Sequence, residues 1–319
     1  MSSQHRPVLL MQALQGLAIQ PNGRYIDATY GRGGHAAAML EQLNAEGRLL
    51  ALDRDPSAVA DAHERFAGEQ RFCIVQAPFS QLAEVVEARF GEVPTVQGVL
   101  LDLGVSSPQL DDAKRGFSFH HDGPLDMRMD PTVGVSAANW LQTIAESELV
   151  AVLRHYGEER FSKRVARMIV QARNEAPIVN TGRLAAIISA AIPNREAGLH
   201  PATRSFQAIR IAINGELDEL AAVLEQAKRV LATGGRLVVI SFHSLEDRLV
   251  KRFFRQHAQA DDLPPDLPIP VHYNNASLRI VGKPVRASAT EIASNPRARS
   301  AIMRVAERLA EKCTQERAL

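Results

Sequence analysis

The chain has 319 residues, a hydrophobic fraction of 45% and a formal net charge of +1 at pH 7. This length accommodates one large domain or two domains with cores of their own, and the near-neutral charge means that any nucleic-acid partner must meet a local basic patch. No apolar run approaches the roughly 20 residues of a membrane-spanning helix, so no membrane partner is expected. Cys73 and Cys313 lie far apart without metal-ligand spacing, which argues against disulfides or a metal site and favours a reducing, cytoplasmic location.

Short apolar segments alternate with helical segments in the first third of the chain. Strands that alternate with helices form parallel sheets, so this rhythm predicts an α/β fold. Asp55, followed by Pro56, predicts the N-cap and first position of the helix after the second strand. The expected strands cover residues 23–27, 48–53, 71–76 and 96–102.

The alternation stops after Gly104, where helical segments dominate. We expect helices over 136–144, 146–156, 158–174 and 181–191. The pattern predicts a helical domain of residues 105–204 inserted into a sheet domain of residues 1–104 and 205–319. In the last part we expect a long helix over 205–231, a buried strand over 234–241, a helix over 242–256, a proline-rich loop over 261–270 and a C-terminal helix over 299–312.

A glycine-rich turn, Asp27-Ala-Thr-Tyr-Gly-Arg-Gly-Gly-His35, joins the first strand to a helix. Glycines let the backbone approach a ligand closely, and a helix N-terminus offers free N–H groups. The order strand, glycine turn, helix is typical of a nucleotide-cofactor site, although such a turn can also be purely structural.

Four residues lie at or just beyond the ends of the predicted parallel strands: Asp27, Asp53, Phe79 and Asp102. Ligands bind at this edge in open α/β sheets. Asp53 has two oxygens that can accept the hydroxyls of a ribose, and Asp55 already supplies the helix cap beside it. Phe79 suits either an adenine ring or the core, and Asp102 suits a polar or cationic part of a cofactor.

Two cofactor classes fit this pattern. The turn loosely satisfies the fingerprint of nicotinamide dehydrogenases, in which the helix N-terminus meets a pyrophosphate. S-adenosylmethionine carries an amino group and a sulfonium instead. Because Asp27 would repel a pyrophosphate, it favours the methyltransferase alternative. A non-catalytic RNA-binding assembly factor with the same fold is a third possibility.

Eight long motifs lie along the chain, at residues 27–35, 102–111, 115–119, 123–130, 156–164, 200–210, 241–248 and 295–300. They resemble motifs of the bacterial 16S ribosomal RNA cytosine-N4 methyltransferases. The resemblance implies a Rossmann-like class I methyltransferase sheet and methyl transfer from S-adenosylmethionine to a cytidine amine in the decoding region, within the small ribosomal subunit. It places cofactor contacts on Gly33, Gly34, His35, Asp53, Phe79, Asp102 and Gln109.

The turn after Asp102 is the expected catalytic segment. An aromatic amine is a poor nucleophile, and acceptors around Ser106, Ser107 and Pro108 could localise its lone pair toward the methyl group. The turn lacks the aromatic residue that other amino-methyltransferases often carry there, so the target base would have to stack elsewhere, on Phe117 or Phe119.

The inserted domain is the expected RNA reader. Residues 151–215 contain ten Lys or Arg and four acids, and ten minus four gives a local charge of +6. A local basic excess is the footprint of phosphate binding, although a solvated helix face is the simpler alternative. The RNA-binding candidates are Arg160, Arg164, Arg167, Arg204 and His243. The sequence leaves the oligomeric state open, a homodimer included.

Overall fold

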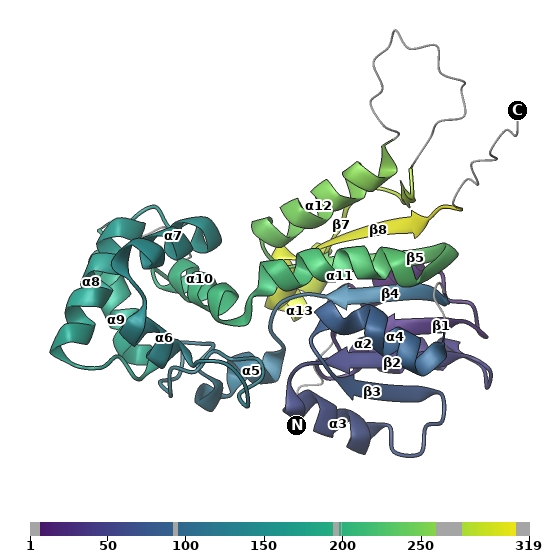
Figure 1. Ribbon diagram of the computed structural model, residues 1–319, viewed down its shortest axis with the longest axis horizontal. Coiled ribbons are helices and arrows are strands. Elements are labelled where there is room, and N and C mark those ends of the chain that lie inside the picture. The colour runs from purple at the N-terminus through teal and green to yellow at the C-terminus, as the bar shows by residue number, and fades with distance from the viewer. Residues whose placement is uncertain (1–6, 92–94, 194–197, 199, 260–275, 311–319) are drawn as a thin grey trace, which may run out of the picture. The chain divides into compact units, whose positions relative to one another are not determined.

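A computed structural model describes most of the chain, which divides into two compact units (Figure 1). One unit comprises Met1–Gly104 and Glu219–Leu319, and the other comprises Val105–Asp218. The second boundary lies within the helix Glu216–Val230, whereas the sequence suggested a division between residues 204 and 205. The described residues are 7–91, 95–193, 198, 200–259 and 276–310.

The first unit is built on an eight-stranded sheet with the order β3-β2-β1-β4-β5-β8-β6, and β7 also pairs with β8. Strands β1 to β5 run parallel, and β8 runs antiparallel to β5, β6 and β7. This topology confirms the predicted Rossmann-like α/β sheet. The strands are β1 (Arg24–Asp27), β2 (Arg48–Asp53), β3 (Phe72–Gln76), β4 (Val96–Asp102), β5 (Leu231–Ser241), β6 (Leu278–Ile280), β7 (Val285–Arg286) and β8 (Ile302–Arg308).

Both faces of the sheet are covered by helices. Successive strand residues point to opposite faces, so Ile26 joins one apolar cluster and its neighbour Tyr25 joins the other. A strand buried on both faces is apolar almost throughout, which explains the unbroken apolar run of β2. One layer holds α1 (Leu10–Leu17), α2 (Gly34–Gln42) and α3 (Pro56–Arg65), and the other holds α4 (Leu82–Phe90), α11 (Glu216–Val230) and α12 (Ser244–Ala258).

The expected cap of α3 is confirmed: Oδ1 of Asp55 accepts a hydrogen bond from the backbone N–H of Ser57 at 2.9 Å, and Pro56 opens the helix. The expected single helix over 205–231 is wrong. Gly215 has a φ of 60° and ends α10 (Thr203–Asn214) before α11 begins. Glycine adopts this left-handed conformation without strain, and it is a common helix terminator.

The expected C-terminal helix over 299–312 is also wrong. A short 3₁₀ turn, Pro296–Ser300, is followed by strand β8. Met303 and Val305 are buried on one face of the sheet and Ala306 on the other. Pairing of β8 with β5 on one side and with β6 and β7 on the other overrides the helical preference of this Ala- and Arg-containing segment. Residues 311–312 and the expected proline-rich loop over 261–270 lie outside the described residues.

The second unit is helical. Its core is formed mainly by the apolar faces of helices, with Leu141, Leu153, Ile169, Ile188 and Phe206 among the buried residues. The four helices expected between 136 and 191 are present, although α8 begins at Ser162 rather than at 158. The helices are α5 (Ser107–Asp111), α6 (Ala137–Thr143), α7 (Glu146–Gly157), α8 (Ser162–Glu175), α9 (Thr181–Ala191) and α10. Among the described residues of the whole chain, no helix has the length and apolarity to cross a bilayer.

Candidate functional site

Three acidic residues end three adjacent parallel strands of the first unit. Asp27 ends β1, which lies between β2, ending at Asp53, and β4, ending at Asp102. The segment beyond β1 stays attached to its neighbours. Tyr30 donates its N–H to the carbonyl of Leu52 at 3.1 Å, and Thr29 Oγ1 accepts the N–H of Asp102 at 2.7 Å. The strand order therefore brings the three carboxyl groups to one edge, as the sequence predicted.

The glycine turn between β1 and α2 is shaped by the protein itself. Gly31 and Gly33 have φ values of 57° and 64°, a left-handed conformation that favours glycine. A Cβ on Gly33 would lie 2.5 Å from the ring of Tyr30, and one on Gly34 would lie 2.3 Å from Cγ of Pro7. These glycines are thus required by close packing as well as by any ligand.

Asp53 anchors this turn. Its Oδ2 accepts the N–H of Gly31 at 2.8 Å, and its Oδ1 accepts the N–H of Asp55 at 2.9 Å. We expected Asp53 to be free for a ligand because Asp55 caps the helix, but both oxygens of Asp53 already accept backbone hydrogen bonds. Each carboxylate oxygen has a second lone pair, so Asp53 retains acceptor capacity for a hydroxyl ligand. Burial raises its pKa to about 6.

Asp27 and Asp102 each keep one oxygen without a partner. Asp27 is 1% exposed; its Oδ1 accepts the N–H of Thr29 at 3.2 Å, whereas its Oδ2 is buried and has no hydrogen-bond partner among the described residues. Oδ1 of Asp102 is likewise buried and has no hydrogen-bond partner among the described residues. Burial raises the pKa of Asp27 to about 7, with a further contribution from Asp53. The pKa of Asp102 lies well above its ordinary value. Burial is the main cause, and the negative charges of Asp27 and Glu246 add to it.

These two unpaired oxygens indicate what the site binds. A buried acceptor without a donor costs free energy, and neighbouring carboxylates repel each other unless a cation or a proton is present. An ammonium and a sulfonium would supply positive charge and N–H donors at this edge, whereas a pyrophosphate would add repulsion. The acceptor oxygens of Asp27 and Asp102, with Asp53 nearby for a ribose, therefore fit S-adenosylmethionine.

His35 lies in the first turn of α2 and is 5% exposed. Its Nε2 lies 3.1 Å from the carbonyl oxygen of Val8. A carbonyl only accepts, so Nε2 carries the proton. Burial lowers the pKa of His35 to about 4, so the ring is neutral at pH 7 and Nδ1 is an acceptor. Nδ1 lies 3.5 Å from Oδ2 of Asp102, and together these atoms form a second acceptor pair at the edge.

The start of α12 brings a further acid to this edge that sequence reasoning missed. Glu246 is 3% exposed, and its Oε2 accepts the N–H of Phe242 at 2.8 Å. It forms a capping box with His243, whose Nε2 lies 3.0 Å from Oε1 of Glu246. A capping box has a sequence signature, a polar N-cap residue followed three residues later by Glu, which could have identified Glu246. RNA binding by His243 stays a prediction.

Phe79 follows β3 in a short 3₁₀ turn, Phe79–Gln81, and is partly buried against the first apolar cluster. Two side chains of α11 fix the chain after it. Glu219 accepts the N–H of Ser80 at 3.2 Å, and Gln226 accepts the N–H of Ala83 at 2.8 Å. Phe79 is thus held at the sheet edge, and its contact with an adenine stays a prediction.

The expected catalytic turn belongs to the second unit. Ser106 is the N-cap of α5, and Oε1 of Gln109 accepts its N–H at 2.9 Å. Ser107 and Gln109 are 7% and 6% exposed. The turn is therefore locally well ordered, while the catalytic role of Ser106, Ser107 and Pro108 and the cofactor contact of Gln109 stay predictions.

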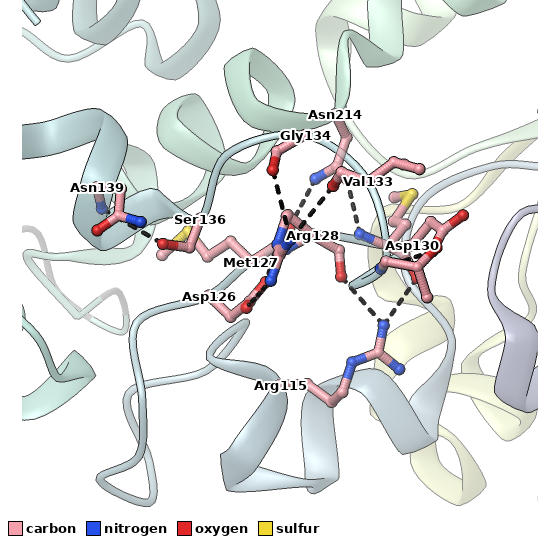
Figure 2. Close-up of polar contacts among 12 residues, drawn as sticks. Arg115, Asp126, Met127, Arg128, Asp130, Val133, Gly134, Ser136, Asn139 and Asn214 are labelled. Carbon is pink, nitrogen blue, oxygen red and sulfur yellow. Dashed lines mark hydrogen bonds and ion pairs between the residues drawn. The ribbon is translucent and has the colours of Figure 1, made fainter.

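A tightly bonded loop carries the motif of residues 123–130 (Figure 2). Met127 is fully buried with a φ of 62°, an unusual conformation for a residue with a side chain. Asn214 fixes it from both sides: its Nδ2 donates to the carbonyl of Met127, and its Oδ1 accepts the N–H of Met129, each at 2.8 Å. Arg128 binds both oxygens of Asp126, at 2.9 and 2.7 Å. A strained backbone conformation that several hydrogen bonds hold in place is typical of functional loops.

The basic residues of α8 are accessible. Arg164 and Arg167 are exposed on this helix, and Arg160 is exposed just before it. These three side chains form no ion pair within the part of the chain that the structure describes. Arg204 is only partly buried but has interactions of its own. RNA binding by all four stays a prediction.

The aromatic residues proposed for base stacking have different environments. Phe117 is 6% exposed and belongs to the core of the helical unit. Phe119 stacks on the ring of His200, with centroids 4.4 Å apart, and meets Phe206 edge-on. Because His200 is exposed, this pair is the more accessible of the two aromatic sites.

Sequence comparisons identify the family of the chain. The model of the MraW methylase family matches residues 2–309. A ribosomal RNA small subunit methyltransferase H from Nitrosococcus oceani is 58% identical, covering 96% of this chain and 97% of its own length. The protein of that name from Thioalkalivibrio sulfidiphilus is 55% identical, with 96% and 98% covered. Among solved structures, a putative rRNA methylase from Clostridium thermocellum matches with a TM-score of 0.45 and 11% identity, covering 96% of this chain and all of that one.

Proposed function

We propose a ribosomal RNA substrate for this chain, which belongs to the MraW methylase family and is an S-adenosylmethionine-dependent methyltransferase. Family membership confirms the resemblance that the sequence motifs indicated, and it removes the dehydrogenase alternative. According to their names, the relatives reported above methylate the ribosomal RNA of the small subunit. From these names and from the motifs, we infer N4-methylation of a cytidine in the decoding region of 16S ribosomal RNA, within the small subunit and in the cytoplasm.

One observation supports binding of S-adenosylmethionine at this site: the oxygens of Asp27 and Asp102 at the ends of neighbouring strands are buried and unpaired. When bound, S-adenosylmethionine supplies a methyl group activated by a sulfonium. Asp27 and Asp102 attract its positive charges, and His35 offers an acceptor beside Asp102. Asp53 accepts the ribose hydroxyls while it holds Gly31 in place.

The chemical step requires activation and alignment of the cytidine amine. We assign the acceptors for the amine hydrogens to the segment Ser106–Pro108, because the ordered start of α5 presents polar groups there. Alignment of the amine with the methyl group supplies much of the remaining rate. Ser107→Ala and Pro108→Ala variants that both keep full turnover and normal cofactor binding would contradict this assignment.

Recognition of the RNA falls to the helical unit. Exposed guanidinium groups of Arg160, Arg164 and Arg167 can form paired hydrogen bonds with phosphates. The stacked pair of Phe119 and His200 offers a flat surface for an unpaired base. Both features suit a single-stranded or irregular RNA segment rather than a free nucleoside.

Transfer of a labelled methyl group tests the proposal. The protein is incubated with labelled S-adenosylmethionine and unmodified small subunits, and large subunits serve as the control. We expect label in the RNA of the small subunit only. If the protein bound S-adenosylhomocysteine but transferred no label to either subunit, the proposed substrate would be wrong.

A further inference from the structure

Helix α12 of the sheet unit has a solvent face that carries only positive charge beyond its first turn. The face consists of Arg248, Lys251, Arg252 and Arg255, all exposed, and we call it the α12 stripe. The opposite face, with Val250, Phe253 and Phe254, is buried against the sheet. The stripe is therefore held rigidly by the core while its charges point to solvent.

Arg248 has an interaction of its own, whereas the charges of the other three residues of the stripe are not balanced locally. The two acids of α12 are occupied elsewhere: Glu246 is buried in its capping box, and Asp247 binds Arg304 with two hydrogen bonds of 2.7 and 3.0 Å. Lys251 and Arg252 have no ion pair within residues 7–91, 95–193, 200–259 and 276–310. The same holds for Arg255.

Helix stability does not account for this arrangement. Arg248 and Arg252, like Lys251 and Arg255, are four positions apart, and like charges at this spacing destabilise a helix. The helix dipole favours cations only in the last turn, which includes Arg255 but not Lys251 or Arg252. A bound polyanion would remove the repulsion, so the stripe is better suited to a ligand than to the free protein.

The stripe begins close to the cofactor edge. Helix α12 follows β5, and its first turn holds Glu246, whose charge contributes to the raised pKa of Asp102. With a rise of 1.5 Å per residue, the seven steps from Arg248 to Arg255 extend about 10 Å along the helix axis. A chain of phosphates lying on this face would therefore run from the edge that holds the cofactor acids outward over the sheet unit.

We propose that the α12 stripe binds the phosphate backbone of the substrate RNA, so that the sheet unit contacts RNA directly in addition to the helical unit. This inference rests on the proposed ribosomal RNA substrate. The chemistry favours phosphate because three of the four residues are arginines, whose planar guanidinium groups bind phosphate oxygens in pairs.

A charge reversal with a matched control tests the stripe. Arg252→Glu is compared with Arg89→Glu, which changes an exposed arginine on α4 of the same unit. Binding of full-length protein to unmodified small subunits, and to naked 16S ribosomal RNA, is measured over a range of salt concentrations. Each phosphate contact contributes about 0.7–0.9 to the slope of log affinity against log salt, so we expect Arg252→Glu to lower the slope by about 1 and to weaken binding roughly tenfold near 0.1 M salt.

The outcomes separate this inference from the proposed function. Unchanged S-adenosylhomocysteine binding shows that both variants fold. If Arg252→Glu and Arg89→Glu bind alike, the stripe does not contact RNA. If Arg252→Glu weakens binding to subunits but not to naked RNA, the partner is a ribosomal protein and the inference is wrong. Failure of the wild-type protein to methylate small subunits would instead overturn the proposed function.

Discussion

Nδ1 of His35 lies 3.5 Å from Oδ2 of Asp102, and the hydrogen bond of Nε2 to the Val8 carbonyl leaves Nδ1 without a proton. Two acceptors thus face each other at the end of β4, beside the unpaired Oδ1 of Asp102. A cationic N–H donor would satisfy all three atoms. Acceptor atoms from the glycine turn and from the end of the fourth strand thus lie together, where they can bind the same cationic group.

Replacing His35 by leucine should weaken cofactor binding specifically. His35→Leu removes the acceptor beside Asp102, and one charge-assisted hydrogen bond contributes about 1.5–3 kcal/mol, so we expect S-adenosylhomocysteine to bind roughly tenfold to a hundredfold more weakly in calorimetry. His63→Leu, on the exposed side of α3, is the control and should leave the affinity unchanged. Equal affinity for both variants would mean that His35 only packs against Val8.

Asp27 should lower the stability of the cofactor-free protein at neutral pH. Its pKa is raised from 3.8 to about 7 in the folded state, so the folded protein binds a proton more tightly than the unfolded chain does. The contribution of this proton to the free energy of unfolding is fully present below about pH 4 and is lost as the pH rises through 7. Asp27→Asn cannot lose this proton, and we expect it to be more stable than the wild type at pH 8 by up to about 4 kcal/mol.

Denaturant unfolding of both proteins between pH 5 and 8 measures this difference, and S-adenosylmethionine binding is measured in parallel. The wild type should bind the cofactor more tightly as the pH rises toward 7.5, because the ionised carboxylate attracts the cation. Asp27→Asn should bind weakly throughout. A variant that is less stable than the wild type at pH 8, or that binds normally, would contradict the role given to Asp27.

Gly33→Ala should disrupt the turn more than a comparable glycine substitution elsewhere. Gly33 and Gly68 both have positive φ, 64° and 82°, but a Cβ at Gly33 collides with Tyr30 whereas one at Gly68 meets nothing within 4 Å. Gly68→Ala therefore measures backbone strain alone, of about 1–2 kcal/mol. We expect Gly33→Ala to cost about 1–3 kcal/mol more in thermal unfolding and to lose cofactor affinity. Equal costs would show that the ring of Tyr30 simply moves aside.

The basic face of α8 should make RNA binding more sensitive to salt. Reversal of Arg164 and Arg167 to glutamate removes two expected phosphate contacts, so the salt slope for small-subunit binding should fall by about 1.4–1.8. Cofactor affinity should not change, because both side chains are exposed on α8 and neither is an expected cofactor contact. Identical binding of wild type and variant at every salt concentration would exclude this face from the RNA interface.

Residue patterns predicted much of the fold because they act locally. Asp55 and Pro56 specify the start of α3 by capping, and the continuous apolar run of β2 specifies a strand buried on both faces. The segment over residues 302–308 was predicted wrongly because its structure depends on pairing with β5 and β6, which are distant in sequence. The break at Gly215 was missed because the apolar periodicity continues on both sides of it.

The site was predictable as a set of strand-end acids, but its detailed contacts were not. Parallel topology places Asp27, Asp53 and Asp102 together once the strands are recognised. That Asp53 holds Gly31, and that Glu246 contributes charge from the start of α12, follows only from the three-dimensional arrangement. The sequence also gives no signal for the tie between Asn214 and the loop at Met127, because 87 residues separate the two.

The most direct test of the account is the identity and position of the methylated nucleoside. After reaction with unmodified small subunits, the 16S ribosomal RNA is digested, its nucleosides are analysed by mass spectrometry, and the modified fragment is mapped. We expect a single new N4-methylcytidine in the decoding region, absent when Asp27→Asn replaces the wild type. Methylation on another base, on carbon 5 of cytosine, or outside the decoding region would contradict it.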